Sequence, residues 1–245
     1  MKFVIRLADV NIGINSIYNE IVLLCRDYLT DGEPAFCVSV SPEDIEQEQM
    51  KNIREAEAEG IPPVKYRPSY LETLAVYRKI AVQMLDRDTL LLHGAVIAVG
   101  DRAWLFTAPS GTGKTTHIRL WLENIAGSYV VNGDKPLIRV GEDVTVYGTP
   151  WAGKEGMQRN TGVRLCGIVL LERGAENNIG RITLSQALPV LIQQSYRPND
   201  RGAVEKTLAL IAKLAGRIPL YRLSCNMLPE AALTAYHTLD QDTEH

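Results

Sequence analysis

The 245-residue sequence predicts an α/β fold, on three observations from the middle of the chain. Residues 103–107 are a short apolar run with two aromatic side chains, bounded by a Gly-Asp pair and a proline, which is typical of a buried strand. From Lys114, apolar residues recur with the spacing of one helix face until Gly127. Residues 129–131 form another short β run that ends just before Asp134. A strand, a glycine-rich loop, a helix and a second strand therefore follow one another.

The chain before this segment, residues 1–87, is predicted to form a small N-terminal α/β subdomain. Strands are expected at residues 3–7 and 36–40. Between them we expect a helix, capped near Asn15 or Ser16, with one apolar face made by Ile17, Ile21, Leu24 and Tyr28.

Two further helices are expected in this subdomain. Ser41 followed by a proline and two acids predicts a helix start, and the charged run that follows indicates a solvated helix or a mobile flap that stops at Gly60. Ser69 and Glu72 have the spacing of a capping box, which predicts a helix from there to about residue 86.

Residues 88–245 are predicted to form the core of the protein, with helices toward the C-terminus. Besides those above, strands are expected at 90–92, 95–99, 137–140, 144–147, 167–171, 179–184 and 219–223. Helices are expected at 186–194, capped by Ser185, at 200–215 and at 229–239. An acidic, frayed tail is expected after the last helix.

The loop between the first strand and helix has the residues of a phosphate-binding loop, and we expect Ser110, Gly111, Thr112, Gly113, Lys114, Thr115 and Thr116 to bind a nucleotide. The two glycines allow backbone N–H groups to face a phosphate, and the helix N-terminus adds its positive dipole. Lys114 would reach the β and γ phosphates, and the Thr115 hydroxyl would bind Mg²⁺. Ala108 stands where the motif has its first glycine. The alternative is a surface loop that only caps a helix.

A carboxylate follows the next strand. Asp134 ends the β run at 129–131, and a carboxylate there can lie beside Lys114 and Thr115. It would then bind the metal or take a proton from an attacking hydroxyl. The alternative is an exposed turn residue before Pro136.

Three motifs in this order carry a family resemblance. Leu92-His93-Gly94, the loop 106–116 and the strand ending at Asp134 resemble the nucleotide-binding core of HPr kinase/phosphorylase and of the ATP-dependent phosphoenolpyruvate carboxykinases. The resemblance covers about residues 88–200. It implies a P-loop core with a mixed, partly antiparallel sheet and His93 next to the transferred phosphate; taken alone, His93 could be a strand-end histidine with a structural role. Asp134 then either serves as both catalytic base and metal ligand, or one of these roles is lost. Those families usually have two acids at this strand end, whereas this chain has one.

Two later segments offer candidate substrate contacts. The segment 148–156 contains two closely spaced glycines, and we expect the loop 150–160 to close over a substrate or the nucleotide. Trp151 would supply contact area and Lys154 would supply charge. The alternative is a connector whose tryptophan covers the edge of the core. Arg197 is either a phosphate clamp or a cation at the C-terminal end of a helix.

Composition excludes several classes of protein. The net charge of −3 indicates neither a nucleic-acid partner nor a membrane surface, and there is no apolar stretch of 18 residues. The cysteines lack metal or redox spacing, so we expect reduced thiols in a cytoplasmic protein; they are Cys25, Cys37, Cys166 and Cys225. The sequence leaves open whether the chain forms a homo-oligomer.

The resemblance implies a kinase that uses ATP and Mg²⁺ to phosphorylate a hydroxyl, and the expected acceptor is a serine of a peptide, a small protein or a free metabolite. In that reaction Lys114 and Mg²⁺ would neutralise charge, and Asp134 or His93 would accept the hydroxyl proton. The single acid supports a second hypothesis, a nucleotide-binding regulatory module that has lost catalysis. The short chain disfavours a carboxykinase, and phosphorylase activity does not follow.

Overall fold

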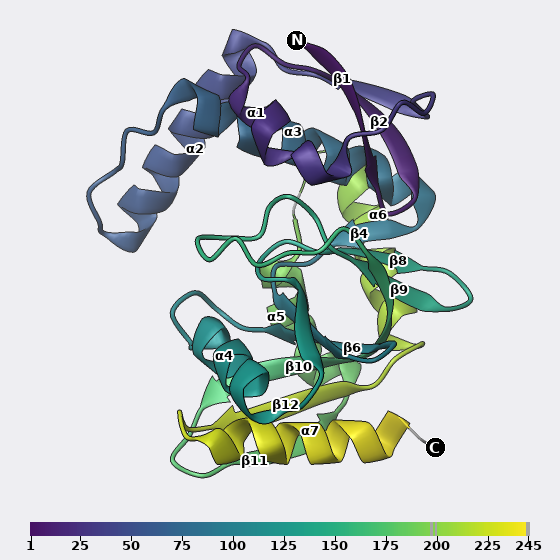
Figure 1. Ribbon diagram of the computed structural model, residues 1–245. Helices are drawn as coiled ribbons and strands as arrows, with labels where there is room; N and C mark the ends of the chain where they lie inside the picture. The colour runs from purple at the N-terminus through teal and green to yellow at the C-terminus, as the bar shows by residue number, and fades with distance from the viewer. Residues whose placement is uncertain (197, 199, 244–245) are drawn as a thin grey trace. The chain divides into compact units, whose positions relative to one another are not determined.

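The computed structural model describes residues 1–196, 198 and 200–243 (Figure 1). The chain divides into two compact units, Met1–Gln83 and Met84–His245. This division lies four residues before the predicted boundary after residue 87.

The first unit contains a three-stranded sheet of β1 (Lys2–Leu7), β2 (Val10–Asn15) and β3 (Phe36–Ser39). β1 and β2 form an antiparallel hairpin, and β2 pairs with β3 in parallel. The strands at 3–7 and 36–40 are confirmed, but β2 was not predicted. Its hairpin turns at Ala8 and Asp9, both with positive φ, and this pair lacks the glycine that usually signals such a turn.

The predicted helix with Ile17 and Tyr28 on one face is largely wrong. The chain forms only a five-residue helix, α1 (Glu20–Leu24), followed by the 3₁₀ turn η1 (Arg26–Tyr28). Ile17 is 44% exposed, whereas Ile21 and Tyr28 are buried. The apolar spacing therefore reflects two short turns rather than one amphipathic helix.

The longer helices of this unit are α2 (Pro42–Glu59) and α3 (Pro68–Met84), and the 3₁₀ turn η2 (Leu85–Arg87) follows. The predicted start of α2 is confirmed, because Ser41 and Asp44 form a reciprocal capping box. Gly60 ends α2 with a φ of +69°. The predicted capping box of α3 is wrong: the Glu72 side chain is fully buried and accepts hydrogen bonds from the backbone N–H groups of Ile17 and Tyr18.

In the second unit, the described residues form a nine-stranded mixed sheet. The strand order is β4-β8-β9-β10-β6-β5-β7, and β12 pairs with both β10 and β11. The strands are β4 (Thr89–Leu91), β5 (Ala95–Val99), β6 (Arg102–Thr107), β7 (Ser128–Asn132), β8 (Leu137–Val140), β9 (Val144–Tyr147), β10 (Gly162–Arg173), β11 (Asn178–Ile182) and β12 (Leu220–Cys225). The chain is thus mixed α/β, as the sequence predicts, and each predicted strand of this unit is present. The main difference is β10, which begins five residues before residue 167.

The helices of this unit are α4 (Lys114–Asn124), α5 (Leu184–Gln194), α6 (Arg201–Ala215) and α7 (Pro229–Thr243). Two predicted ends are wrong. The N-cap of α5 is Thr183 rather than Ser185, because Thr183 and Gln186 form the capping box. The helix α7 continues to Thr243 instead of ending in a frayed tail at residue 239. There the Asp242 carboxylate accepts a hydrogen bond from the Tyr221 hydroxyl, which ties the last turn to β12.

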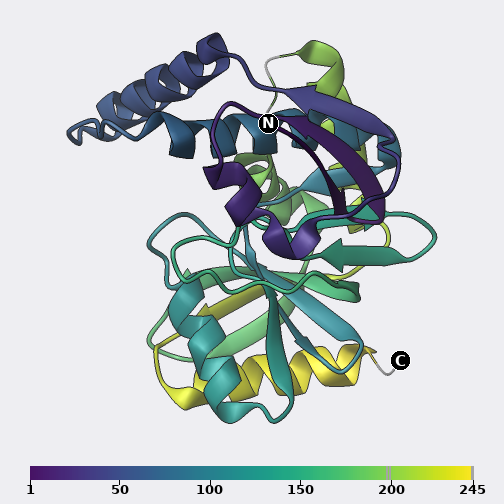
Figure 2. The ribbon, with the colours of Figure 1, turned by 45° about the horizontal axis from the view of Figure 1, so that its top comes forward.

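Three aromatic side chains fix α4 on the sheet. Trp104 and Phe106 of β6 contact Trp121 of α4, with ring centroids 5.8 and 5.4 Å apart. All three side chains are fully buried. Trp121 also contacts Tyr236 of α7, with ring centroids 5.6 Å apart, and both views show α4 and α7 side by side (Figures 1 and 2). This core holds β6 and α4 rigidly, so the loop between them is presented at one edge of the sheet.

The four cysteines are unpaired thiols, and all four lie in the described part of the chain. No helix within that part is long and apolar enough to cross a bilayer.

Candidate functional site

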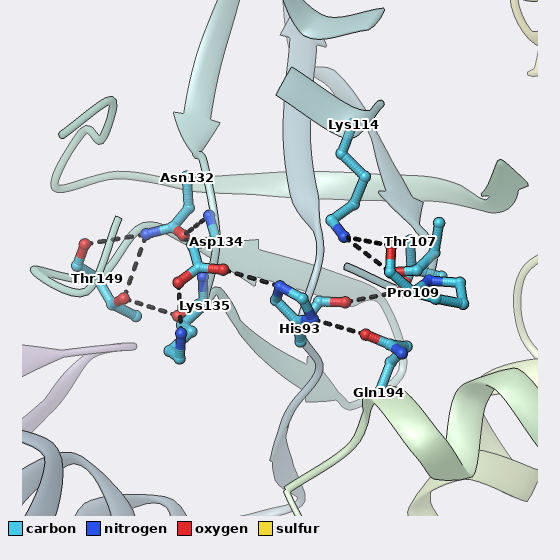
Figure 3. A network of polar contacts seen from close by, with 10 residues as sticks. His93, Thr107, Pro109, Lys114, Asn132, Asp134, Lys135, Thr149 and Gln194 are labelled. Carbon is cyan, nitrogen blue, oxygen red and sulfur yellow. Dashed lines mark hydrogen bonds and ion pairs between the residues drawn. The ribbon is translucent and has the colours of Figure 1, made fainter. Parts of the chain in front are cut away.

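The strand order brings the sequence-predicted residues to one edge of the sheet. β5 lies between β6 and β7 and is antiparallel to both. The chain therefore leaves β6 and β7 at the same edge at which it enters β5. The glycine-rich loop follows β6, Asp134 follows β7, and His93 precedes β5, so all three segments meet there (Figure 3).

The loop has the backbone conformation that its glycines permit. Gly111 and Gly113 have φ values of +77° and +119°, which disfavour any residue with a Cβ atom. Gly113 is the N-cap of α4, so the first backbone N–H groups of that helix lie at the loop and have no acceptor within the helix. Ala108, the departure from the motif, has no positive φ and is buried. A methyl group is therefore accommodated at that position.

Lys114 lies across the mouth of the loop. Its Nζ atom donates hydrogen bonds to the carbonyls of Ala108 at 2.7 Å and Pro109 at 3.5 Å (Figure 3). Partial burial lowers the pKa of Lys114, the nearby Asp134 carboxylate opposes this shift, and Lys135 adds to it. The loop lysine and the acid of the neighbouring segment thus lie within electrostatic range of each other.

His93 joins Asp134 to α5. Its Nε2 atom is 2.9 Å from Asp134 Oδ1, and its Nδ1 atom is 2.6 Å from the Gln194 side-chain oxygen (Figure 3). The His93 N–H also donates to the Gln194 carbonyl, and the Thr107 hydroxyl donates to the His93 carbonyl. Both ring nitrogens are therefore engaged, and the ring orientation is fixed from two sides.

The Asp134 carboxylate contacts cationic or N–H groups at both oxygens: His93 at Oδ1 and the Lys135 ammonium at Oδ2. Burial raises the pKa of Asp134, but the His93 hydrogen bond and Lys135 together lower it to about 2. The group is a carboxylate at neutral pH, and it is a weak base. The alternative of an exposed turn residue is wrong, because the side chain is only 20% exposed.

Asn132 supports this strand end and was not singled out from the sequence. The side chain is fully buried, and its Oδ1 atom accepts the N–H groups of Asp134 at 2.9 Å and Lys135 at 2.7 Å. Its Nδ2 atom donates to the carbonyl and the hydroxyl of Thr149. An asparagine at a strand end often accepts a hydrogen bond from the backbone two residues later, so Asn132 before Asp134 is the sequence signal that could have identified this turn.

The loop between β9 and β10 lies against Asp134. The N–H of Gly133 donates to the Met157 carbonyl, and a Cβ at Gly153 would lie 3.1 Å from Asp134 Cβ. Trp151 is only 7% exposed, which favours the alternative that it covers the core over the prediction of a substrate contact. Lys154 is exposed, as a substrate-contacting cation must be. Arg197 lies outside the described residues.

The remaining loop residues Ser110, Thr115 and Thr116 are exposed. Within the described part of the chain, no group of three or more His, Cys, Asp or Glu side chains could hold a metal. The donor set fits Mg²⁺ in its usual nucleotide-bound form, because one carboxylate and one hydroxyl suffice when phosphates and waters supply the other ligands. Asp134 and Thr115 would be these two ligands.

A cavity of about 520 Å³ adjoins the loop. It is lined by the loop residues 107–112, by the end of β10 and by Val190 of α5. Arg173, the last residue of β10, lines it and contacts the loop backbone. Neither Arg173 nor Gln194 could be selected from the sequence, since both act through the tertiary fold.

No protein-family model matches the chain, and no curated protein matches it. Among solved structures, the chain is similar to the Hpr(Ser) kinase/phosphatase from Coxiella burnetii, with 10% sequence identity and a TM-score of 0.27. The match covers 63% of this chain and 99% of that chain. A similarity of this size carries no conclusion about the fold or the activity of this chain, so the proposals below depend on its own geometry.

Proposed function

We propose that the protein is a Mg²⁺-dependent kinase that transfers the γ-phosphoryl group of ATP to a hydroxyl, with a serine of a peptide, a small protein or a small metabolite as the acceptor. The observation that carries this proposal is that the ends of β6 and β7 bring the loop with Lys114 and the segment with Asp134 to one sheet edge, where the two loop glycines have positive φ. Phosphoryl transfer needs chiefly positioned charge and an aligned acceptor.

In this proposal, the loop and Lys114 bind the phosphates. The N–H groups at the start of α4 face an anion, and the helix dipole adds to the attraction. The Lys114 ammonium already lies beside the loop, where it donates hydrogen bonds to the carbonyls of Ala108 and Pro109. Exchanging those carbonyls for phosphate oxygens would replace neutral acceptors with charged ones, which form stronger hydrogen bonds.

Mg²⁺, when bound with the nucleotide, supplies further neutralisation of phosphate charge. Thr115 and Asp134 would hold it. The low pKa of Asp134, about 2, keeps this side chain ionised at neutral pH, as a magnesium ligand must be.

His93 would act on the acceptor through Asp134. Because Asp134 is a carboxylate, the Nε2 atom of His93 must carry the hydrogen of their 2.9 Å contact. Nε2 is then a donor and cannot take the hydroxyl proton, so the direct proton-acceptor role of His93 is not supported in this arrangement. Because His93 occupies Oδ1, the acceptor hydroxyl would donate its hydrogen bond to Asp134 Oδ2, the oxygen that Lys135 contacts in this structure.

The test is transfer of labelled phosphate from γ-labelled ATP, in Mg²⁺, to serine-containing peptides, small proteins and free serine. We expect transfer to at least one acceptor, and a loss of roughly 10²–10³-fold or more in Lys114→Ala, as for other single electrostatic groups. Lys213→Ala is the control, because Lys213 is a partly exposed cation of α6 that pairs with Asp88. Equal transfer by wild type and Lys114→Ala would contradict the proposal.

The contacts of Asp134 support a second hypothesis, a nucleotide-binding module without catalysis. Its two oxygens contact His93 and Lys135, and no adjacent acid shares the tasks of metal binding and proton acceptance. Tight ATP binding combined with no transfer to any acceptor class would favour this module over the kinase.

A further inference from the structure

The end of β10 reaches the phosphate loop because of the register of the sheet. β10 runs parallel to β6, and Leu170 is the last residue of β10 that pairs with β6, opposite Thr107. Beyond this pair β6 turns into the loop, whereas β10 continues for three residues beside β12. Arg173 therefore lies where its side chain can reach across to the loop tip.

The Arg173 guanidinium binds two consecutive loop carbonyls. Its Nε atom donates to the Thr112 carbonyl at 3.2 Å, and its Nη2 atom donates to the Gly111 carbonyl. This uses the planar fork of arginine, which can hold two acceptors in a fixed geometry; a lysine ammonium cannot do so as a rigid unit.

These two contacts set the direction of two loop N–H groups. In a trans peptide, the carbonyl of one residue and the N–H of the next lie in one plane and point in opposite directions. Holding the carbonyls of Gly111 and Thr112 toward Arg173 therefore turns the N–H groups of Thr112 and Gly113 away from it. In this structure the Thr112 N–H makes only a long contact, 3.4 Å, with the Pro109 carbonyl.

The loop needs such support because of its glycines. Gly111 and Gly113 flank the held peptide groups, and a Cβ added at either position would meet open space. No neighbouring group therefore contacts these positions where a side chain would begin, and glycine has more backbone conformations to lose than any other residue. Without Arg173, we expect the loop peptide groups to rotate, so that carbonyls rather than N–H groups often face the position of the phosphates.

We propose that Arg173 is a positioning residue for phosphate binding, which holds the Gly111 and Thr112 carbonyls so that the N–H groups of the loop face the phosphates. This inference depends on the proposed nucleotide binding and adds to it a residue that acts through the loop. It predicts that replacing Arg173 weakens binding of the phosphate groups of the ligand and leaves the contribution of its base and sugar unchanged.

The test compares two probes, ATP with Mg²⁺ and inorganic tripolyphosphate with Mg²⁺, by calorimetric titration of the wild type, Arg173→Ala and Arg173→Lys. Arg173→Ala should weaken binding of both probes by the same factor, about ten- to a hundredfold, as expected for hydrogen bonds to a charged group. Arg173→Lys should recover only part of this loss. The control is Arg201→Ala, which removes an exposed arginine of α6 that pairs with Glu205.

Amide hydrogen exchange of the loop and the melting temperature separate positioning from a loss of folding. Arg173→Ala should raise exchange at residues 111–114 and leave the melting temperature within a degree or two, because Arg173 is exposed. Wild-type affinity for both probes in Arg173→Ala would overturn the inference, and so would a loss confined to ATP. If the wild type binds neither probe, the proposed function itself is wrong, and the inference falls with it.

Discussion

Replacing Asn132 with alanine should destabilise the second unit and release Asp134. The substitution removes one acceptor and one donor from a fully buried position. Three backbone groups would lose their partners: the N–H of Asp134, the N–H of Lys135 and the carbonyl of Thr149. An unsatisfied buried group costs roughly 1–3 kcal/mol, which gives about 3–9 kcal/mol for three.

The lower half of this range is expected, about 3–6 kcal/mol, because water can reach the partly exposed turn around Asp134 and replace some of the lost bonds. The assay is urea unfolding followed by circular dichroism, together with amide exchange at residues 132–135. Asn124→Ala is a matched control, since the Asn124 side chain makes a single hydrogen bond, to the Leu120 carbonyl within its own helix. A loss below about 1 kcal/mol, with unchanged exchange at the turn, would refute the reasoning.

Three further predictions concern the same edge of the sheet. Gly153→Ala should cost about 1–2 kcal/mol more than Gly60→Ala, because both glycines have positive φ but only a Cβ at Gly153 would press on Asp134; urea unfolding of the two variants measures this. Asp134 has a pKa lowered from 3.8 to about 2, so it adds stability above pH 3.8 that is lost as the pH falls toward 2. This amounts to about 2 kcal/mol, and Asp134→Asn should flatten that part of the curve of stability against pH; an unchanged curve would contradict the assignment. Lys154→Ala should raise the KM for the acceptor, and unchanged kinetics would leave the loop a connector.

The local part of the site could be predicted from the sequence because its signals are short in range. The β6 strand, the loop glycines and the start of α4 lie within 20 residues, and their backbone conformations follow from residue type. The same holds for the capping of α2 by Ser41.

The contacts that orient the site could not be predicted. His93 and Gln194 are 101 residues apart, and only the sheet order and the position of α5 bring them together. Trp151 is buried although its loop is rich in glycine, since local composition does not reveal which side chain faces the core. Glu72 had the spacing of a cap, but its burial against Ile17 and Tyr18 depends on the tertiary fold of the first unit.

The central claim is that Lys114 and Asp134 act on one phosphoryl group, and a double-mutant cycle tests it most directly. The measurement is single-turnover ADP formation from ATP in Mg²⁺, with water as the acceptor where no other is known, for the wild type, Lys114→Ala, Asp134→Asn and the double variant. Residues that act as a unit give strongly non-additive losses, so the double variant should be about as slow as the slower single variant. Losses that simply multiply, or ADP formation at the wild-type rate in either single variant, would contradict the account.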